Sequence, residues 1–132
     1  MQSKKNSGLK VLTKGQVEAE ISNALISFER EHMGRGPVEA KTYIFEDIVL
    51  IRLKGVLTPA ERHLAIDEEG IQLIKQVRTK LMENAHAMLK DIIRKITGVS
   101  PVSLYTDIST KTGERFIIIT FEEELESRCR RN

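Results

Sequence analysis

A repeated corner motif constrains the fold of this chain more than any other feature of its sequence. Residues 34–38 read Gly-Arg-Gly-Pro-Val and residues 98–102 read Gly-Val-Ser-Pro-Val, so both share the pattern Gly-x-x-Pro-Val. The same offset pairs apolar positions before the motif and strand-like positions after it. An internal repeat of this kind predicts two copies of one supersecondary unit, here about residues 13–55 and 74–122.

The first half of the chain reads as one helix followed by one hairpin. Thr13 and Gln16 have the spacing of a capping box, and apolar residues then recur every three or four positions, so we expect a helix that ends at Gly34. Residues 39–45 and 48–54 read as two strands, and their close spacing indicates an antiparallel hairpin.

The second half repeats this order after a short insertion. Thr58 and Glu61 form a second capping box around a proline, which predicts a short inserted helix. A long helix over residues 70–97 follows, and residues 102–109 and 115–122 read as the second hairpin. The apolar stripe expected on the long helix consists of Ile74, Val77, Leu81, Ala85, Met88, Ile92 and Ile96.

Two such units predict an α+β fold. One helix and one hairpin cannot cover each other's apolar faces, but two copies can share a core. We therefore expect a four-stranded antiparallel sheet with two main helices on one face, plus the short inserted helix. Residues 13–125 should form this single domain, with a disordered basic tail at 1–12 and a basic tail at 126–132.

The composition bears on where the protein works. Cys129 is the single cysteine, which excludes an internal disulfide and fits a reducing cytoplasm. No apolar run approaches the length of a membrane span, and no signal peptide is evident in the first residues. We therefore expect a cytoplasmic protein, whose basic tails allow a peripheral position at the inner face of the membrane.

Patterns for catalysis or metal binding are weak. Glu29-x-x-His32 and Glu83-x-x-His86 each place two metal ligands on one side of a helix. The repeat does not align the two motifs, and the further ligand-bearing helices of a di-metal bundle are missing, so we expect no metal site. No Ser/His/Asp or Cys/His pattern is discernible either. We therefore expect no catalytic residues, no cofactor and no enzyme activity.

The long helix suggests two kinds of macromolecular partner. Its basic residues fit nucleic acid, but the net charge of +2 and the small number of aromatic residues argue against direct binding. Ile71, Met82 and Ile93 form a second apolar stripe, and the sheet leaves one face open, so we expect a homodimer. The basic residues are Lys75, Arg78, Lys80, Lys90, Arg94 and Lys95.

Three segments together resemble a known family. They are Gly34-Arg35-Gly36-Pro37, the stretch Gly-Val-Leu-Thr-Pro-Ala-Glu-Arg at residues 55–62, and Thr97-Gly98. In order and spacing they resemble the bacterial MpsC-like family, also called YbcI-like, over residues 15–125. The resemblance implies a soluble accessory beside the integral membrane subunits of a sodium-translocating, membrane-potential-generating system. It implies no reaction and no cofactor. The candidate functional or interaction positions that it marks are Arg35, Thr58, Glu61 and Arg62.

The sequence therefore favours a non-catalytic accessory or regulatory protein of a membrane cation-translocating system that acts through protein–protein contacts. The alternatives are a nucleic-acid-binding regulator and a sensor that grips a small anionic ligand with Arg35 and Arg62. The two halves differ at Arg35-Gly36, and the Thr58 helix follows the first half alone, so we expect any site on that side.

Overall fold

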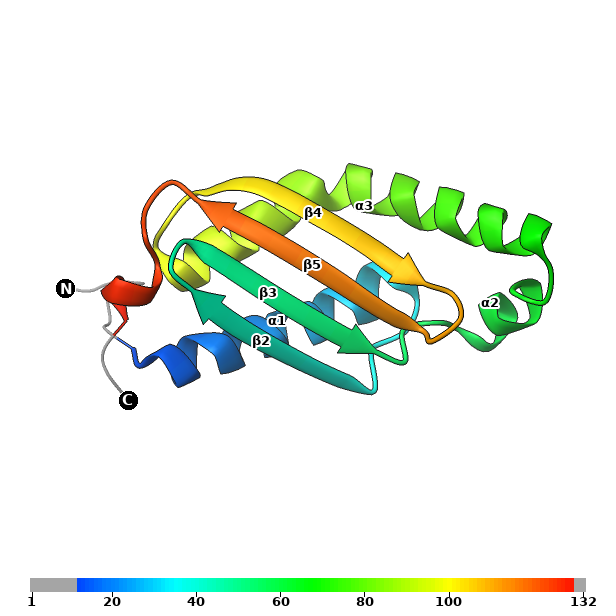
Figure 1. Ribbon diagram of the computed structural model, residues 1–132, viewed down its shortest axis with the longest axis horizontal. Coiled ribbons are helices and arrows are strands. Elements are labelled where there is room, and N and C mark those ends of the chain that lie inside the picture. The colour runs from blue at the N-terminus through cyan, green and yellow to red at the C-terminus, as the bar shows by residue number, and fades with distance from the viewer. Residues whose placement is uncertain (1–11, 130–132) are drawn as a thin grey trace.

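The computed structural model describes residues 12–129, which form a four-stranded sheet with the main helices on one of its faces (Figure 1). The α+β class predicted from the sequence is therefore confirmed. The elements are α1 (Lys14–Met33), β2 (Glu39–Phe45), β3 (Ile48–Lys54), α2 (Pro59–Leu64), α3 (Glu68–Thr97), β4 (Pro101–Ser109), β5 (Glu114–Phe121) and the 3-10 helix η2 (Glu126–Arg128).

The sheet joins the two hairpins through their second strands. The strand order is β2-β3-β5-β4, and all three neighbouring pairs are antiparallel. This order brings β3 and β5 to the centre and leaves β2 and β4 as edges. Two αββ units adopt this order when they pair side by side. The internal duplication of the sequence itself stays a prediction.

The expected helix boundaries follow from capping. Thr13 and Gln16 form the capping box of α1, and Thr58 and Glu61 form that of α2, so both predicted starts are confirmed. The helices α1 and α3 end at Gly34 and Gly98, whose φ angles of 90° and 75° lie in the left-handed region that glycine adopts without strain.

One apolar core lies between the inner face of the sheet and the helices. Leu25 of α1 and Leu89 of α3 pack in the same cluster as Ile51, Ile117 and Ile119 from the two central strands, and all five are fully buried. Alternation along each strand places these residues on one face and their neighbours on the other. The helices cover the first face, so in the described part of the chain the second face stays open (Figure 1).

The apolar stripe predicted for α3 is partly wrong. Val77, Leu81 and Met88 are exposed, because a different line of residues faces the core. Arg78 lies in that line. A prediction based on the spacing of apolar residues does not include a charged residue, so it missed this line. The second stripe is wrong as well, because Met82 and Ile93 are buried in the chain's own core. The buried line is Gly70, Ile74, Arg78, Met82, Ala85, Leu89 and Ile93.

The short helix α2 packs against the first turn of α3 through a glycine. A Cβ atom at Gly70 would lie 1.7 Å from the carbonyl oxygen of Leu64, so a larger residue there would force the two helices apart. Asp67 caps α3 by accepting a hydrogen bond from the backbone N–H of Gly70 at 2.8 Å. This close contact fixes where α2 presents its side chains to α3.

The end of the described chain packs onto the molecule. Leu125 is buried, and Glu126 accepts hydrogen bonds from the Lys14 ammonium at 3.0 Å and the Glu46 backbone N–H at 2.8 Å. Residues 126–129, which we expected in a basic tail, are therefore held against α1 and the first hairpin. Residues 1–11 and 130–132 lie outside the described part of the chain.

Candidate functional site

Two of the four predicted positions hold the loop between β3 and α2. The Nε of Arg35 donates to the carbonyl oxygen of Gly55 at 3.1 Å, and the Nη1 of Arg62 donates to that of Leu57 at 3.1 Å. Thr58 caps the helix that follows this loop. The structure thus gathers Arg35, Thr58 and Arg62 around residues 55–58, where each makes contacts that stabilise the loop.

The fourth predicted position, Glu61, has a second contact besides its cap. Its Oε1 accepts hydrogen bonds from the Thr58 backbone N–H at 2.9 Å and from the Nη2 of Arg78 at 2.7 Å. Its Oε2 accepts a hydrogen bond from the Nε of Arg78 at 2.8 Å. Burial acts to raise the pKa of Glu61, but the hydrogen bonds from Arg78 and Thr58 outweigh it and lower that pKa.

This pair belongs to a buried cluster of charges between the helices and the sheet. Glu29 of α1, Arg78 of α3 and Arg115 of β5 are all at most 2% exposed. Glu29 lies between the two arginines, with its Oε1 at 3.8 Å from the Nη1 of Arg78 and its Oε2 at 3.5 Å from the Nε of Arg115. These distances exceed those of ordinary hydrogen bonds, so the contacts around Glu29 are loose.

Burial dominates the electrostatics of the cluster. It raises the pKa of Glu29, and the charges of Arg115 and Arg78 offset this only in part. It also lowers the pKa of Arg115, which Glu29 offsets in part. A buried ion pair holds its charges well only when hydrogen bonds satisfy its remaining atoms. Neither carboxylate oxygen of Glu29 has a hydrogen-bond partner among the described residues.

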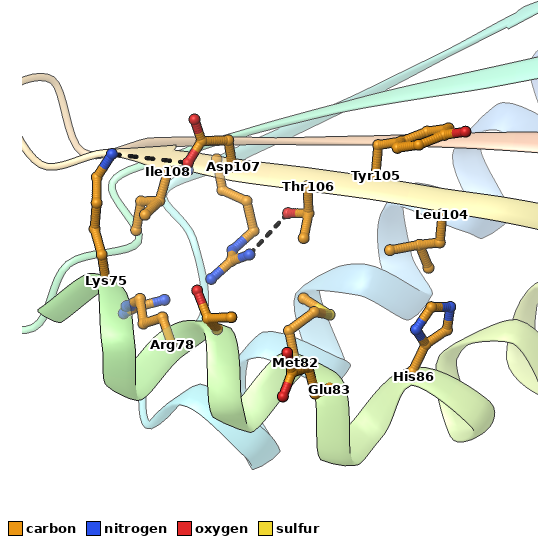
Figure 2. A pocket seen from close by; sticks show the side chains of 12 residues that line it. Lys75, Arg78, Met82, Glu83, His86, Leu104, Tyr105, Thr106, Asp107 and Ile108 are labelled. Atoms are coloured by element: carbon orange, nitrogen blue, oxygen red, sulfur yellow. Dashed lines mark hydrogen bonds and ion pairs between the residues drawn. The ribbon is translucent and has the colours of Figure 1, made fainter.

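A groove of about 380 Å³ opens beside this cluster, between α3 and β4. Figure 2 shows Lys75 and Arg78 at one end of the groove, Met82 further along the helix, and His86 at the other end. In the view of Figure 1, the N-terminal half of α3 projects beyond the β4 edge of the sheet, so strand and helix separate there. The β4 side supplies Leu104, Tyr105, Thr106, Asp107 and Ile108.

Sequence reasoning missed the members of the cluster, although each occupies a core position in its element. Glu29 lies four residues after Leu25 on α1, and Arg115 alternates with Ile117 and Ile119 on β5. In the sequence, Arg78 is one of the basic residues of the long helix, and Glu29 is part of a Glu-x-x-His motif from which no metal site is expected. A charged residue in phase with the apolar pattern is the signal that could have found both.

Several residues of the metal-binding and nucleic-acid-binding patterns contact other residues of this chain. Within residues 12–129, no three His, Cys, Asp or Glu side chains gather closely enough to hold a metal ion. Glu29 faces the two arginines, and the ring of His32 packs on Phe28 at 5.0 Å between centroids. On α3, Lys75 pairs with Asp107, while Arg94 and Lys95 both pair with Asp91.

The open face of the sheet carries an apolar surface, which we call the outer face. Tyr43, Leu50, Ile118 and Tyr105 are successive partners across β2, β3, β5 and β4, so their side chains form one row. Tyr105 is 60% exposed, Tyr43 40% and Ile118 38%. Phe45 extends this surface on β2, where its ring stacks on Tyr43 at 6.4 Å between centroids.

Charges border this apolar surface along the adjacent row. Lys41, Arg52, Phe116 and Asp107 are successive partners from β2 to β4, so the row begins with two cations and ends with an anion. Arg52 of β3 lies 5.6 Å from the centroid of the Phe116 ring on β5. Its Nε donates a hydrogen bond to Glu114, which is also on β5. Contiguous apolar patches with a polar rim are typical of protein interaction surfaces.

Comparisons with known proteins agree with the resemblance seen in the sequence. Residues 13–123 match the model of the family described as "Na+-translocating membrane potential-generating system (MpsC)". No solved structure matches the chain. Within residues 12–129, no helix is both long enough and apolar enough to cross a membrane.

Two relatives come from Bacillus subtilis (strain 168). The chain is 44% identical to the uncharacterized protein YbcI over 114 residues, which cover 86% of this chain and 92% of the relative. It is 21% identical to the uncharacterized protein YrhF over 108 residues, which cover 81% of this chain and 88% of that relative.

Proposed function

The chain belongs to the MpsC family, and on that premise we propose that it is a non-catalytic accessory or regulatory protein of a membrane cation-translocating system. It acts through protein–protein contacts from the cytoplasmic side, at the periphery of the membrane. The family description names a sodium-translocating system that generates membrane potential. An accessory role suits a chain whose described helices do not span a membrane.

The outer face is the observation that carries this proposal. Its central row is apolar across all four strands, and no helix within residues 12–129 covers it. Large apolar side chains in water are unfavourable by roughly 25 cal/mol per Å², so a surface of this kind gains free energy when a partner covers it. The exposed aromatic residues Tyr43, Phe45 and Tyr105 are of the types enriched in such interfaces.

The occupant that best fits the outer face is a second copy of this chain. A two-fold axis parallel to the strands would lay β2 of one protomer over β4 of its partner, with every row facing its own equivalent. Lys41 would then face the second protomer's Asp107, and the apolar row with Leu50 and Ile118 would face its own copy. This charge complementarity occurs twice by symmetry, as an isologous dimer requires.

Charge reversal tests this dimer directly. Sedimentation should show weaker dimers for Lys41→Asp and for Asp107→Lys, because each places like charges opposite each other. The double variant Lys41→Asp/Asp107→Lys restores the opposite charges and should recover the dimer. A wild-type chain that stays monomeric at every concentration measured, or a double variant weaker than both single variants, would overturn this arrangement.

The transport role needs a test in the membrane. A tagged chain should co-purify, from gently solubilised membranes of its own host, with integral membrane subunits that mass spectrometry identifies as parts of a cation-translocating complex. The tag alone is the control. If the chain forms dimers but captures no such subunit, the contact surface stands and the link to transport is wrong.

A further inference from the structure

The groove beside the buried cluster has hydrogen-bond donors that the protein itself does not use. Glu61 and the Val56 carbonyl oxygen engage the Nε and Nη2 of Arg78, which leaves its Nη1 with the Glu29 carboxylate at 3.8 Å and no hydrogen bond. Thr106 accepts from the Nη1 of Arg115 at 2.8 Å, which leaves the Nε and the Nη2 of that residue. These three remaining nitrogens are fully buried and have no hydrogen-bond partner among the described residues.

A buried guanidinium without full pairing is unfavourable, so these donors favour an acceptor that carries negative charge. Arg78 and Arg115 are both 2% exposed and both line the groove. Their side chains are held by Glu61, Val56 and Thr106, so the donors are fixed in place before any ligand arrives. The two arginines are therefore preorganised for binding, in contrast to a flexible cation on the surface.

The middle of the groove has a different chemistry. Met82 from α3, together with Leu104 and Ile108 from β4, gives it apolar walls (Figure 2). At the far end, the Nε2 of His86 is buried and has no hydrogen-bond partner among the described residues. From Arg78 to His86 the helix advances eight residues, or about 12 Å, and the volume of about 380 Å³ lies within the range of small-molecule sites.

We propose that this groove binds a small organic anion, whose carboxylate is held by Arg78 and Arg115 and whose apolar body lies along Met82 and Leu104. The Nη1 of Arg78 and the Nη2 of Arg115 donate to the carboxylate. A polar group at the other end of a longer ligand would reach His86. The ligand class is therefore a carboxylate with an apolar chain or ring, of a size that fits between α3 and β4.

The acidic residues near the groove do not reverse its preference. Asp107 is paired with Lys75 at 3.8 Å, and its side chain is 84% exposed. Glu83 also lines the groove and is exposed. Glu29 lies between the two arginines, and Glu61 pairs with Arg78, so both carboxylates belong to the buried cluster itself. Asp107 and Glu83 are exposed to water, and the buried end of the groove presents the remaining N–H donors of the two arginines.

The buried end of this site is separate from the surfaces considered so far, although Tyr105 and Asp107 at the β4 edge border both the groove and the outer face. Arg35 and Arg62, expected from the sequence to grip an anion, donate to backbone carbonyls of the 55–58 loop and do not line the groove. The outer face lies on the opposite side of the sheet from Arg78 and Arg115. Binding in the groove therefore does not depend on the proposed transport role or on dimer formation.

Calorimetric titration with hexanoate tests the site, with hexanol as the uncharged probe of the same chain length. Wild-type protein should bind hexanoate at one saturable site, and hexanol about tenfold or more weakly, because a hydrogen bond to a charged group is worth about 1.5–3 kcal/mol. Arg115→Gln should weaken hexanoate by a similar factor. The matched control Arg94→Gln changes an arginine of α3 that pairs with Asp91 in solvent, and its affinity should equal that of the wild type.

A second variant keeps the test valid if Arg115→Gln does not fold. Leu104→Trp leaves both arginines in place and fills the groove from the half-buried β4 side, so it should abolish hexanoate binding with the fold intact. Absence of hexanoate binding by the wild type would overturn the proposal. Equal affinities for hexanoate and hexanol, or binding that survives Leu104→Trp, would overturn it as well.

Discussion

The inner and outer faces of the sheet carry opposite exceptions to the rule that apolar side chains face the core and charged ones face water. The inner face buries Arg115 of β5 beside Glu29 and Arg78 from the helices. The outer face exposes the row of Tyr43, Leu50, Ile118 and Tyr105. Both exceptions involve the same strand, β5, whose alternate residues point in the two directions.

Buried charges and exposed apolar residues have different consequences for the protein. Charges in a core make the fold less stable than well-packed apolar residues would, so they indicate binding or specificity more than stability. Apolar residues in water have little effect on the fold of one chain but favour association. The groove and the outer face should therefore respond differently to substitution: the first through stability and ligand affinity, the second through oligomeric state.

The largest effect is expected at Arg78. Arg78→Met removes the partner of Glu61 and one of the two cations that face Glu29, so Glu61 loses its main contact and Glu29 keeps only Arg115. Breaking a buried pair by removing one partner lowers the free energy of unfolding by about 3–5 kcal/mol. Urea denaturation measures this loss.

The control for Arg78 is an arginine of the same helix outside the core. Arg94→Met removes an ion pair with Asp91 that lies in solvent, and it should leave the urea midpoint unchanged. Loss of stability in both variants would mean that α3 is sensitive to any change of arginine. Loss in neither would mean that the buried cluster contributes nothing to the fold.

A pair of neighbours on β5 separates the two faces within one strand. Ile117 is fully buried against the helices, whereas Ile118 is 38% exposed on the outer face. Ile117→Thr should lower the free energy of unfolding by about 2–3 kcal/mol, because it opens a cavity and buries a hydroxyl. Ile118→Thr should change the stability of the monomer by less than about 0.5 kcal/mol.

The dependence of the melting temperature on protein concentration tests whether the outer face is a contact surface. If two copies associate there, the melting temperature of the wild type rises with protein concentration, since association stabilises the folded chain. Ile118→Thr should remove that rise, whereas Ile117→Thr should keep it at a lower overall temperature. A concentration-independent melting temperature in the wild type would contradict association through this face.

Much of the architecture could be predicted because its signals are local. The caps at Thr13 and Thr58 and the stops at Gly34 and Gly98 depend on residues within one or two turns, and all four are confirmed. The strands β2 and β3 follow from β-branched residues on both sides of a tight turn. Helices on one face of the sheet then follow from the need of each apolar face for a cover.

The candidate site could not be predicted because it depends on contacts between distant elements. Glu29, Arg78 and Arg115 belong to three different elements and meet only through the tertiary fold. The groove exists because α3 separates from β4, and no local pattern encodes that separation. Arg78 also explains the error in the phase of α3, since a pattern based on apolar residues cannot include a buried arginine.

The smallest effect that we predict concerns pH, and it compares the two carboxylates of the cluster. Burial raises the pKa of Glu29, so the folded chain holds that proton more tightly than the unfolded chain. The stability advantage of the wild type over Glu29→Gln should therefore fall as pH rises from about 4.3, the ordinary value for glutamate, through the raised pKa. Arg78 and Thr58 lower the pKa of Glu61, so the advantage over Glu61→Gln should instead be lost as pH falls through that lowered pKa. Urea denaturation across this pH range measures both differences. Parallel curves for the two variants would contradict the opposite environments of Glu29 and Glu61.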